Sequence, residues 1–233
     1  MNIKAVSFDL DDTLWPILPV ILKAEELTNT WLINNYPAVE NLLNTEEMTD
    51  IRNKLIFERR DLVYHLSELR KLSLVELGIR SGYTKSESQA MAEESFKIFF
   101  SSRNQVTLYD GVKECLIKLK EKYSLGVVTN GNADLEEIGI DHYFDFDFSA
   151  DEINASKPDP TIFKAVIEKT GLNSKEICHV GDHPVNDVMG SLDVGMHAIW
   201  FNKKQDEWPL DKGLDFREIS SWYELEDVLE EIS

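Results

Sequence analysis

Residues 3–13 read Ile3-Lys4-Ala5-Val6-Ser7-Phe8-Asp9-Leu10-Asp11-Asp12-Thr13, an apolar run that stops abruptly at a group of carboxylates. The apolar part has the length and composition of a buried β-strand. Side chains alternate along an extended chain, so Asp9 and Asp11 are expected to project to the same side while Leu10 turns away. Two carboxylates can therefore face one reacting group at the end of a strand.

Carboxylates gathered at one place repel one another. The repulsion is about 4 kcal/mol per pair at about 4 Å and an effective dielectric of about 20, so the cluster favours a cation or a chemical task. Chance pairs are expected, because 43 of the 233 residues are Asp or Glu. The pair Asp145 and Asp147 is flanked by aromatic residues and has no following Thr, which is typical of a short amphipathic strand with a solvated acidic face.

The composition indicates a folded globular chain. It is 42% hydrophobic and 10% aromatic, enough for one large domain or two small ones. The formal net charge of -19 repels nucleic-acid backbones and anionic membranes, so neither is expected as a partner. The two cysteines, Cys115 and Cys178, show no Cys-x-x-Cys spacing, and no signal-peptide pattern is present. We therefore predict a cytoplasmic protein, either a monomer or a small homo-oligomer.

Four short apolar runs have the length of buried strands: residues 3–8, 125–128, 177–180 and 198–201. Helical patterns lie between the later runs, over residues 112–122 and 162–169, and a last helix is expected at 222–232. This alternation predicts an α/β fold, a Rossmann-like parallel sheet with helices on both faces. In such sheets the ligand lies beyond the carboxyl ends of the strands, where Asp9, Thr129 and Asp182 fall.

The stretch from Pro16 to Gln105 shows helical periodicity and no convincing strand. We expect helices over residues 20–35, 46–77 with an interruption, and 85–102, enough for a small bundle. The sequence thus predicts a catalytic core of residues 1–15 and 106–233, with residues 16–105 inserted after the first strand as a helical cap. The alternative is a packing subdomain that contacts no ligand.

A second acidic pair follows the run at residues 177–180. Gly181 allows a tight turn, and Asp182 and Asp187 are presented five positions apart. Oxygen ligands without a convergent His or Cys suit a hard cation, and Mg²⁺ typically shares few protein ligands with water and substrate phosphate. Taken alone, the loop could equally be a helix N-cap, where Asp is favoured.

Two further segments carry polar groups that suit an anion. Thr129-Asn130-Gly131 lies between a strand and a predicted helix, where its hydroxyl, amide and backbone N–H groups could hold an anion, although an ordinary turn has the same pattern. Lys157 lies in a stretch that Pro158 and Pro160 stiffen, which would aim its ammonium. Each signal is weak alone, and their joint occurrence in this order favours a common site.

These segments together resemble the four motifs of the haloacid dehalogenase superfamily of phosphohydrolases. The matching stretches are Asp9 to Thr13, Val128 to Gly131, Lys157 to Pro160 and Gly181 to Asp187. The resemblance covers the whole predicted core, and residues 16–105 are similar to the helical cap of those enzymes. Within the superfamily, the chain most resembles small bacterial phosphatases that act on flavin mononucleotide and related phosphorylated metabolites.

The resemblance implies a Mg²⁺-dependent phosphatase that hydrolyses a small phosphorylated metabolite, such as flavin mononucleotide, a nucleotide or a sugar phosphate, through an aspartyl-phosphate. Asp9 would be the nucleophile, and Asp11 would act first as acid and then as base. Lys157 would keep Asp9 ionised. The transferring oxygens would be bound by Asp12, Thr129, Asn130 and Gly131.

The same resemblance implies the metal ligands. Mg²⁺ would be held by Asp9, the main-chain oxygen of Asp11, Asp182 and Asp187, the last of which could instead bind through water or hold Lys157. Arg70 is one of several cations of the cap that could contact the substrate.

Three alternatives stay open. A 2-haloacid dehalogenase of the same superfamily attacks carbon, needs no metal and typically lacks an acid two residues after its nucleophile, so Asp11 and Asp182 speak against it. A phosphomutase would retain a phosphorylated intermediate, and no residue pattern separates it from a phosphatase. A phospho-accepting receiver-like switch also combines clustered Asp, Mg²⁺, a Thr and a Lys, but receivers are much shorter and lack the insertion.

Overall fold

The computed structural model describes residues 2–210 and 213–232. The chain divides into two compact units. Unit 1 comprises Met1–Pro16, Thr107–Gly131 and Ile138–Ser233, and unit 2 comprises Ile17–Val106 and Asn132–Glu137. The short segment at 132–137 thus belongs with unit 2, which no sequence signal indicated. The assignment of residues 1–15 and 106–233 to catalysis, and of 16–105 to a cap, stays a prediction.

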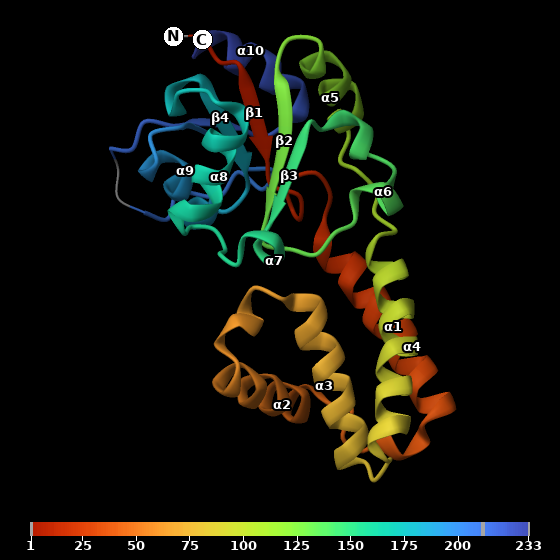
Figure 1. Ribbon diagram of the computed structural model, residues 1–233. Coiled ribbons are helices and arrows are strands. Elements are labelled where there is room, and N and C mark those ends of the chain that lie inside the picture. Colours follow the sequence, from red (N-terminus) through yellow and green to blue (C-terminus); the bar gives the residue numbers. More distant parts are fainter. Residues whose placement is uncertain (1, 211–212, 233) are drawn as a thin grey trace. The chain divides into compact units, whose positions relative to one another are not determined.

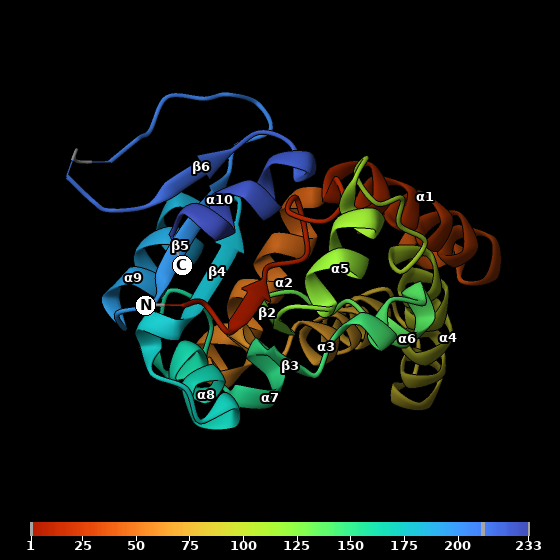
Figure 2. The ribbon, with the colours of Figure 1, turned by 90° about the horizontal axis from the view of Figure 1, so that it is seen from above.

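Unit 1 is built on a parallel sheet of six strands in the order β3-β2-β1-β4-β5-β6 (Figure 1 and Figure 2). The strands are β1 Ala5–Phe8, β2 Ser124–Thr129, β3 Phe146–Ser149, β4 Ile177–Gly181, β5 His197–Phe201 and β6 Arg217–Ile219. Apolar strand β1 lies between β2 and β4, and Ser7 is the direct neighbour of His179 across the β1–β4 pair. The predicted α/β class with a parallel sheet is confirmed.

The two edge strands, β3 and β6, differ in how clearly the sequence pattern predicts them. The pair Asp145 and Asp147 brackets the start of β3, and Asp147 is exposed there, as an amphipathic strand requires. Strand β6 was not predicted. It has three residues, of which only Ile219 is buried, so it is too short to produce a periodic pattern.

Helices cover both faces of this sheet (Figure 1). On one face α8, Pro160–Thr170, buries Ile162, Phe163 and Val166 against the strands. It begins two residues earlier than predicted because Asp159 Oδ1 accepts a hydrogen bond from Thr161 N at 2.8 Å and caps the first turn. The other helical elements of unit 1 are α5 Val112–Lys120, α7 Ala150–Ile153, a π-helical turn Pro184–Met189, α9 Gly190–Asp193 and α10 Leu225–Glu231.

Unit 2 is helical, with α1 Ile17–Asn35, α2 Thr45–Glu58, α3 Leu66–Arg80 and α4 Lys85–Arg103. A further short helix, α6 Leu135–Ile138, begins in its 132–137 segment. The predicted interruption within 46–77 falls at 59–65, which includes the 3-10 helix Arg60–Val63. Leu32, Ile51, Leu77 and Met91 share one buried apolar cluster. None of the described helices is both long enough and apolar enough to cross a membrane.

Candidate active site

An ion triplet lies at the carboxyl ends of β1 and β4. Lys157 Nζ is 2.6 Å from Asp9 Oδ1 and 2.6 Å from Asp187 Oδ1. The Lys157 and Asp187 side chains are only 2% and 1% exposed, so solvent screens these charges little. The structure therefore brings together three residues that the sequence predicted for one site.

The polar segment after β2 holds Lys157 in position. Asn130 Oδ1 accepts a hydrogen bond from Lys157 N at 2.7 Å, and Asn130 Nδ2 donates to Lys157 O at 3.0 Å. Thr129 Oγ1 accepts a hydrogen bond from Gly131 N at 2.9 Å, which closes the turn between them. The Asn130 amide is thus engaged with protein backbone. Thr129 Oγ1 is the acceptor in this bond, so its O–H proton can be donated to an anion, as can backbone N–H groups, and the predicted oxygen contacts of Thr129, Asn130 and Gly131 stay a prediction.

Thr13 connects the two acidic segments. Its Oγ1 accepts a hydrogen bond from Asp182 N at 3.0 Å and lies 3.3 Å from both Asp9 Oδ2 and Asp182 Oδ1. A hydroxyl carries one proton, so it donates to one of these carboxylates at a time. The Asp182 carbonyl oxygen also accepts a hydrogen bond from Trp200 Nε1 at 2.7 Å. Backbone and side chain of Asp182 are therefore both fixed.

Asp11 is oriented by a residue that sequence reasoning did not single out. Trp15 Nε1 donates a hydrogen bond to Asp11 Oδ1 at 2.9 Å, and the Trp15 side chain is fully buried. The chain can turn back toward Trp15 because Asp12 has a left-handed backbone, with φ 60°. Its N–H then donates to Trp15 O at 2.8 Å. The Asp11 carboxylate is thus held at the start of this turn.

His179 and Ser7 were also missed by the sequence analysis. His179 Nε2 lies 3.2 Å from Asp187 Oδ1, and Ser7 Oγ lies 2.8 Å from His179 Nδ1. Burial holds the pKa of His179 below its usual range, so the ring is neutral, with Nε2–H donating to Asp187 and Nδ1 accepting from Ser7. The signal that the sequence offered for this contact was a polar residue inside each of two apolar strands.

The electrostatics of the site favour an added cation. Burial raises the pKa of Asp9 to about 8, helped by Asp187 and Asp182 and opposed by Lys157. Burial, Asp187 and Asp12 raise the pKa of Asp182 to about 7. Burial would also raise the pKa of Asp187, but Lys157 and His179 hold it well below its usual range. Three carboxylates thus lie near a single ammonium group, and two of them, those of Asp9 and Asp182, have raised pKa values.

The donor atoms fit Mg²⁺. Carboxylate oxygens of Asp9, Asp182 and Asp187 lie within 4.8 Å of one another, and oxygen-only ligand sets suit a hard cation. Asp187 already uses both oxygens, because Oδ2 accepts a hydrogen bond from His183 N at 2.9 Å and Oδ1 serves Lys157. Of the three roles left open by the sequence, namely direct ligation, ligation through water and the holding of Lys157, the last is therefore the best match for Asp187. The helix N-cap that the sequence suggested for this loop is His183 and not an aspartate. Its ring nitrogen accepts hydrogen bonds from backbone N–H groups of the next turn.

Arg70 lies in unit 2 and is half-buried. Its Nη2 forms an ion pair with Glu25 Oε1 at 2.9 Å, and its guanidinium stacks on the Phe99 ring at 3.5 Å from the centroid. The predicted contact of Arg70 with a substrate stays a prediction.

Comparison with known proteins identifies the family. A family model described as haloacid dehalogenase-like hydrolase matches residues 3–195. The chain belongs to this family. This hydrolase is 30% identical over 206 residues to the 5-amino-6-(5-phospho-D-ribitylamino)uracil phosphatase YigB of Escherichia coli K12, a match that covers 88% of this chain and 86% of the relative. It is 29% identical over 241 residues to a glyceraldehyde 3-phosphate phosphatase of Methanopyrus kandleri, covering 99% of both chains.

A solved structure has nearly the same fold as this hydrolase. The structure of a 2-haloacid dehalogenase from Pseudomonas syringae pv. Tomato DC3000 matches with a TM-score of 0.95 and 36% identity, over 99% of this chain and 100% of that one. The predicted superfamily and the predicted hydrolase are confirmed, and the named relatives support a phosphatase.

Proposed function

We propose that this hydrolase is a Mg²⁺-dependent phosphatase that cleaves a small phosphomonoester through an aspartyl-phosphate on Asp9. The observation that carries the proposal is the distance of 2.6 Å between Lys157 Nζ and Asp9 Oδ1, inside a group of three carboxylates. Burial alone would keep Asp9 protonated, and only the ionised carboxylate is a nucleophile. A buried ammonium at hydrogen-bond distance favours that ionised form, and Mg²⁺ at the three carboxylates would complete the ionisation, because the pKa of Asp9 is about 8 with Lys157 alone beside it.

In the first step, a carboxylate oxygen of Asp9 forms a bond to phosphorus while the bond from phosphorus to the alcohol oxygen breaks. Asp11 gives its proton to the departing oxygen, and the alcohol leaves. The hydrogen bond from Trp15 at 2.9 Å supports this role because it fixes the direction of the Asp11 carboxyl group. Thr129 and the backbone near Asn130 and Asp12 would bind the transferring oxygens.

In the second step, water attacks phosphorus and gives its proton to Asp11, which is now ionised. The bond between phosphorus and Asp9 breaks, so inorganic phosphate leaves and both carboxyl groups return to their starting states. Mg²⁺ held by Asp9, Asp182 and the main-chain oxygen of Asp11 would supply the positive charge that offsets the phosphate oxygens. Asp187 would keep Lys157 in place.

The substrate class is a small phosphorylated metabolite, with flavin mononucleotide, nucleotides and sugar phosphates as candidates. The names of the relatives support this breadth, because they include a phosphoserine phosphatase, glyceraldehyde 3-phosphate phosphatases and a pyrimidine 5'-nucleotidase. Unit 2 is the candidate cap that would select among such substrates. A phosphomutase would pass the phosphoryl group to a second hydroxyl, so it would release little free phosphate.

A 2-haloacid dehalogenase is the second candidate. The 36% identity to a solved structure of that name favours it. In that reaction an aspartate displaces halide from carbon, and no proton is needed by the leaving group. The fixed acid Asp11 and the metal-type carboxylate Asp182 therefore speak for phosphate chemistry.

The test measures phosphate release from p-nitrophenyl phosphate, with Mg²⁺ and with EDTA, and chloride release from 2-chloropropionate. We expect Mg²⁺-dependent phosphate release and no chloride. Asp9→Asn should abolish turnover, whereas Asp147→Asn, the same change at an exposed aspartate, should not. Borohydride reduction during turnover should convert Asp9 to homoserine if the aspartyl-phosphate forms. Full activity of Asp9→Asn would remove the covalent mechanism, and chloride release would favour the dehalogenase.

A further inference from the structure

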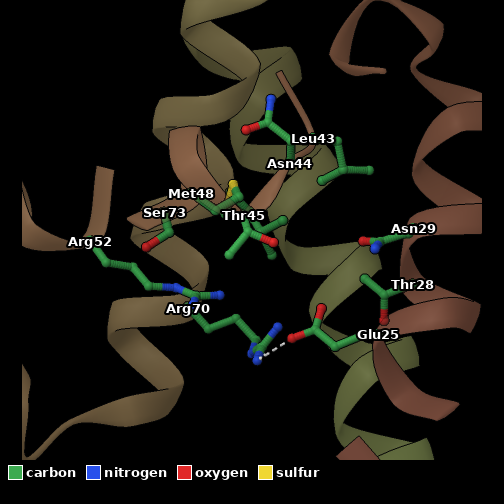
Figure 3. Close-up of a pocket in the computed structure, with 11 residues that line it drawn as sticks. Glu25, Thr28, Asn29, Leu43, Asn44, Thr45, Met48, Arg52, Arg70 and Ser73 are labelled. Atoms are coloured by element: carbon green, nitrogen blue, oxygen red, sulfur yellow. Dashed lines mark hydrogen bonds and ion pairs between the residues drawn. The ribbon is translucent and has the colours of Figure 1, made fainter. Parts of the chain in front are cut away.

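Unit 2 contains a cavity of about 330 Å³ between α1, α2 and α3 (Figure 3). The apolar part of the cavity lining is formed by Leu43, Met48 and Leu74. The rest of the lining is polar and includes two guanidinium groups, of Arg52 and Arg70, with one carboxylate, Glu25. The volume lies at the lower end of the range of about 300–1,000 Å³ that is typical of small-molecule sites.

One of the two arginines is rigidly placed. The Arg70 guanidinium lies between the Phe99 ring and Glu25, and its side chain is 20% exposed. Burial lowers the pKa of Arg70, and the nearby positive charge of Arg52 lowers it further, while Glu25 opposes both. A second anion in the cavity would relieve the remaining repulsion between the two guanidinium groups.

The other arginine, Arg52, differs from Arg70 in that no described residue pairs with its charge. Within residues 2–210 and 213–232, Arg52 makes no ion pair, and Figure 3 shows its side chain extending along the cavity toward Arg70. Four other cations of unit 2 are paired with acids: Arg59 with Asp61 and Glu68, Arg80 with Glu47, Asp50 and Glu76, Lys54 with Glu76, and Lys71 with Glu93. The cavity therefore carries an excess of one positive charge in a chain whose net charge is -19.

We propose that this cavity binds a small organic anion, whose carboxylate or phosphate group lies against Arg52 and Arg70. A guanidinium fork presents two parallel donors that match the two oxygens of such a group. Leu43, Met48 and Leu74 would contact the compact apolar part of the ligand. Glu25 fixes Arg70, so Arg52 supplies the charge that the ligand neutralises.

The binding of an anion goes beyond the proposed function and does not depend on it, whereas the assignment of that anion to the substrate rests on the proposed function. The anion is either a second charged group of the phosphomonoester substrate or a separate effector. Both sources present the same chemistry to the arginines, so the two arms of the experiment separate them.

The first arm measures binding without catalysis. The full chain is titrated in EDTA with sodium succinate at constant ionic strength, and backbone amide NMR shifts are followed. We expect saturable shifts at cavity residues such as Asn44 and Thr45, and at least a tenfold weaker apparent affinity in Arg52→Gln. Arg60→Gln makes the same charge change at an exposed position of the same unit and should bind as the unchanged protein does.

Arg52→Lys is the control for a folding defect, because this variant keeps the positive charge and loses only the forked guanidinium group. It should bind with intermediate affinity. Equal affinity of Arg52→Gln and the unchanged protein, or shifts confined to unit 1, would overturn the proposal.

The second arm compares the KM of phosphoserine, which carries a carboxylate, with that of glycerol phosphate. A selective rise of the phosphoserine KM in Arg52→Gln, with kcat unchanged, supports the site and assigns it to the substrate. Unchanged KM values together with the loss of succinate binding support the site and assign it to an effector. If no phosphatase activity exists, the proposed function fails while the binding arm still decides this inference.

Discussion

The ammonium of Lys157 lies 2.6 Å from Asp9 Oδ1, although 148 residues separate the two in the chain. The same ammonium lies 2.6 Å from Asp187, so it is shared by two buried carboxylates. Asn130 fixes the backbone of Lys157 from the neighbouring strand end. Folding thus sets the charge state of the residue that we propose as the nucleophile.

Replacement of Lys157 by methionine should damage both stability and activity. The change leaves Asp9 and Asp187 buried without their common countercharge, and removal of one partner of a buried ion pair costs about 3–5 kcal/mol. Urea unfolding in EDTA should show a loss of that order in the free energy of unfolding. Phosphate release should also disappear. Lys164→Met, at an exposed lysine of α8, is the matched control, and a stable, active Lys157→Met protein would contradict this account.

Replacement of Trp15 by phenylalanine should weaken the acid step. The ring stays buried, but the N–H that holds Asp11 Oδ1 at 2.9 Å is lost. General acid catalysis contributes about 10²–10⁴-fold, so we expect kcat/KM for glycerol phosphate to fall by about 10–100-fold. p-Nitrophenyl phosphate should be less affected, because its leaving group needs no proton.

Trp31→Phe is the control for the loss of an indole elsewhere in the chain. An equal fall for both substrates, together with a lower melting temperature, would assign Trp15 a purely structural role.

The stability of the metal-free protein should fall as the pH rises through about 7 to 8. The pKa values of Asp9 and Asp182 are raised from 3.8 to about 8 and about 7 on folding. A raised carboxyl pKa stabilises the folded state fully below pH 3.8, and this contribution is lost as the pH rises through the folded-state pKa. His179 adds no change above its ordinary pKa of 6.5.

Mg²⁺ ligation requires the ionised carboxylates, so its stabilising effect should grow over the same interval. Melting temperatures in EDTA and in Mg²⁺, compared at about pH 6.5 and about pH 8.5, measure both trends. The shift produced by Mg²⁺ should be larger at the higher pH and smaller in Asp182→Asn. A Mg²⁺ shift that is independent of pH would show that these carboxylates do not take up protons in the metal-free protein.

Replacement of Gly181 by alanine should displace Asp187. An added Cβ would lie 2.3 Å from Asp187 Cγ, and Asp187 cannot withdraw without loss of its bonds to Lys157 and His179. Overpacking of this kind costs about 1–3 kcal/mol, and activity should fall with it. The same glycine substitution in an Asp187→Gly background should cost much less, because Asp187 Cβ, which lies 2.5 Å from the added atom, is then removed together with Cγ. Additive effects in this double-mutant cycle would exclude the clash.

The sequence predicted the parallel sheet and the convergence of Asp9, Asp182 and Asp187, because both depend on local pattern. Apolar runs of strand length mark the buried strands, and the polar residues that follow them meet at one edge of any parallel sheet. Lys157 was predicted for the site only through the joint occurrence of the motifs, since its own segment does not indicate which residues its side chain contacts.

Other features could not be read from the chain. His179 and Ser7 look like isolated polar residues within apolar strands, and only the register of β1 against β4 makes them neighbours. The pairing of Arg70 with Glu25 joins residues 45 positions apart on two helices, and helical periodicity does not fix how two helices face each other. The predicted roles of the site residues, the cytoplasmic location and the oligomeric state stay predictions.

The hydrogen bond between Ser7 and His179 has a consequence for folding as well as for chemistry. These residues are opposite each other in the β1–β4 pair, and a slip of one position would turn each side chain to the other face of the sheet. A shifted pairing would separate the Ser7 hydroxyl from the His179 ring, and a buried polar group that loses its partner costs about 1–3 kcal/mol. The polar contacts next to the reactive centre therefore also destabilise a misaligned register of the central strands.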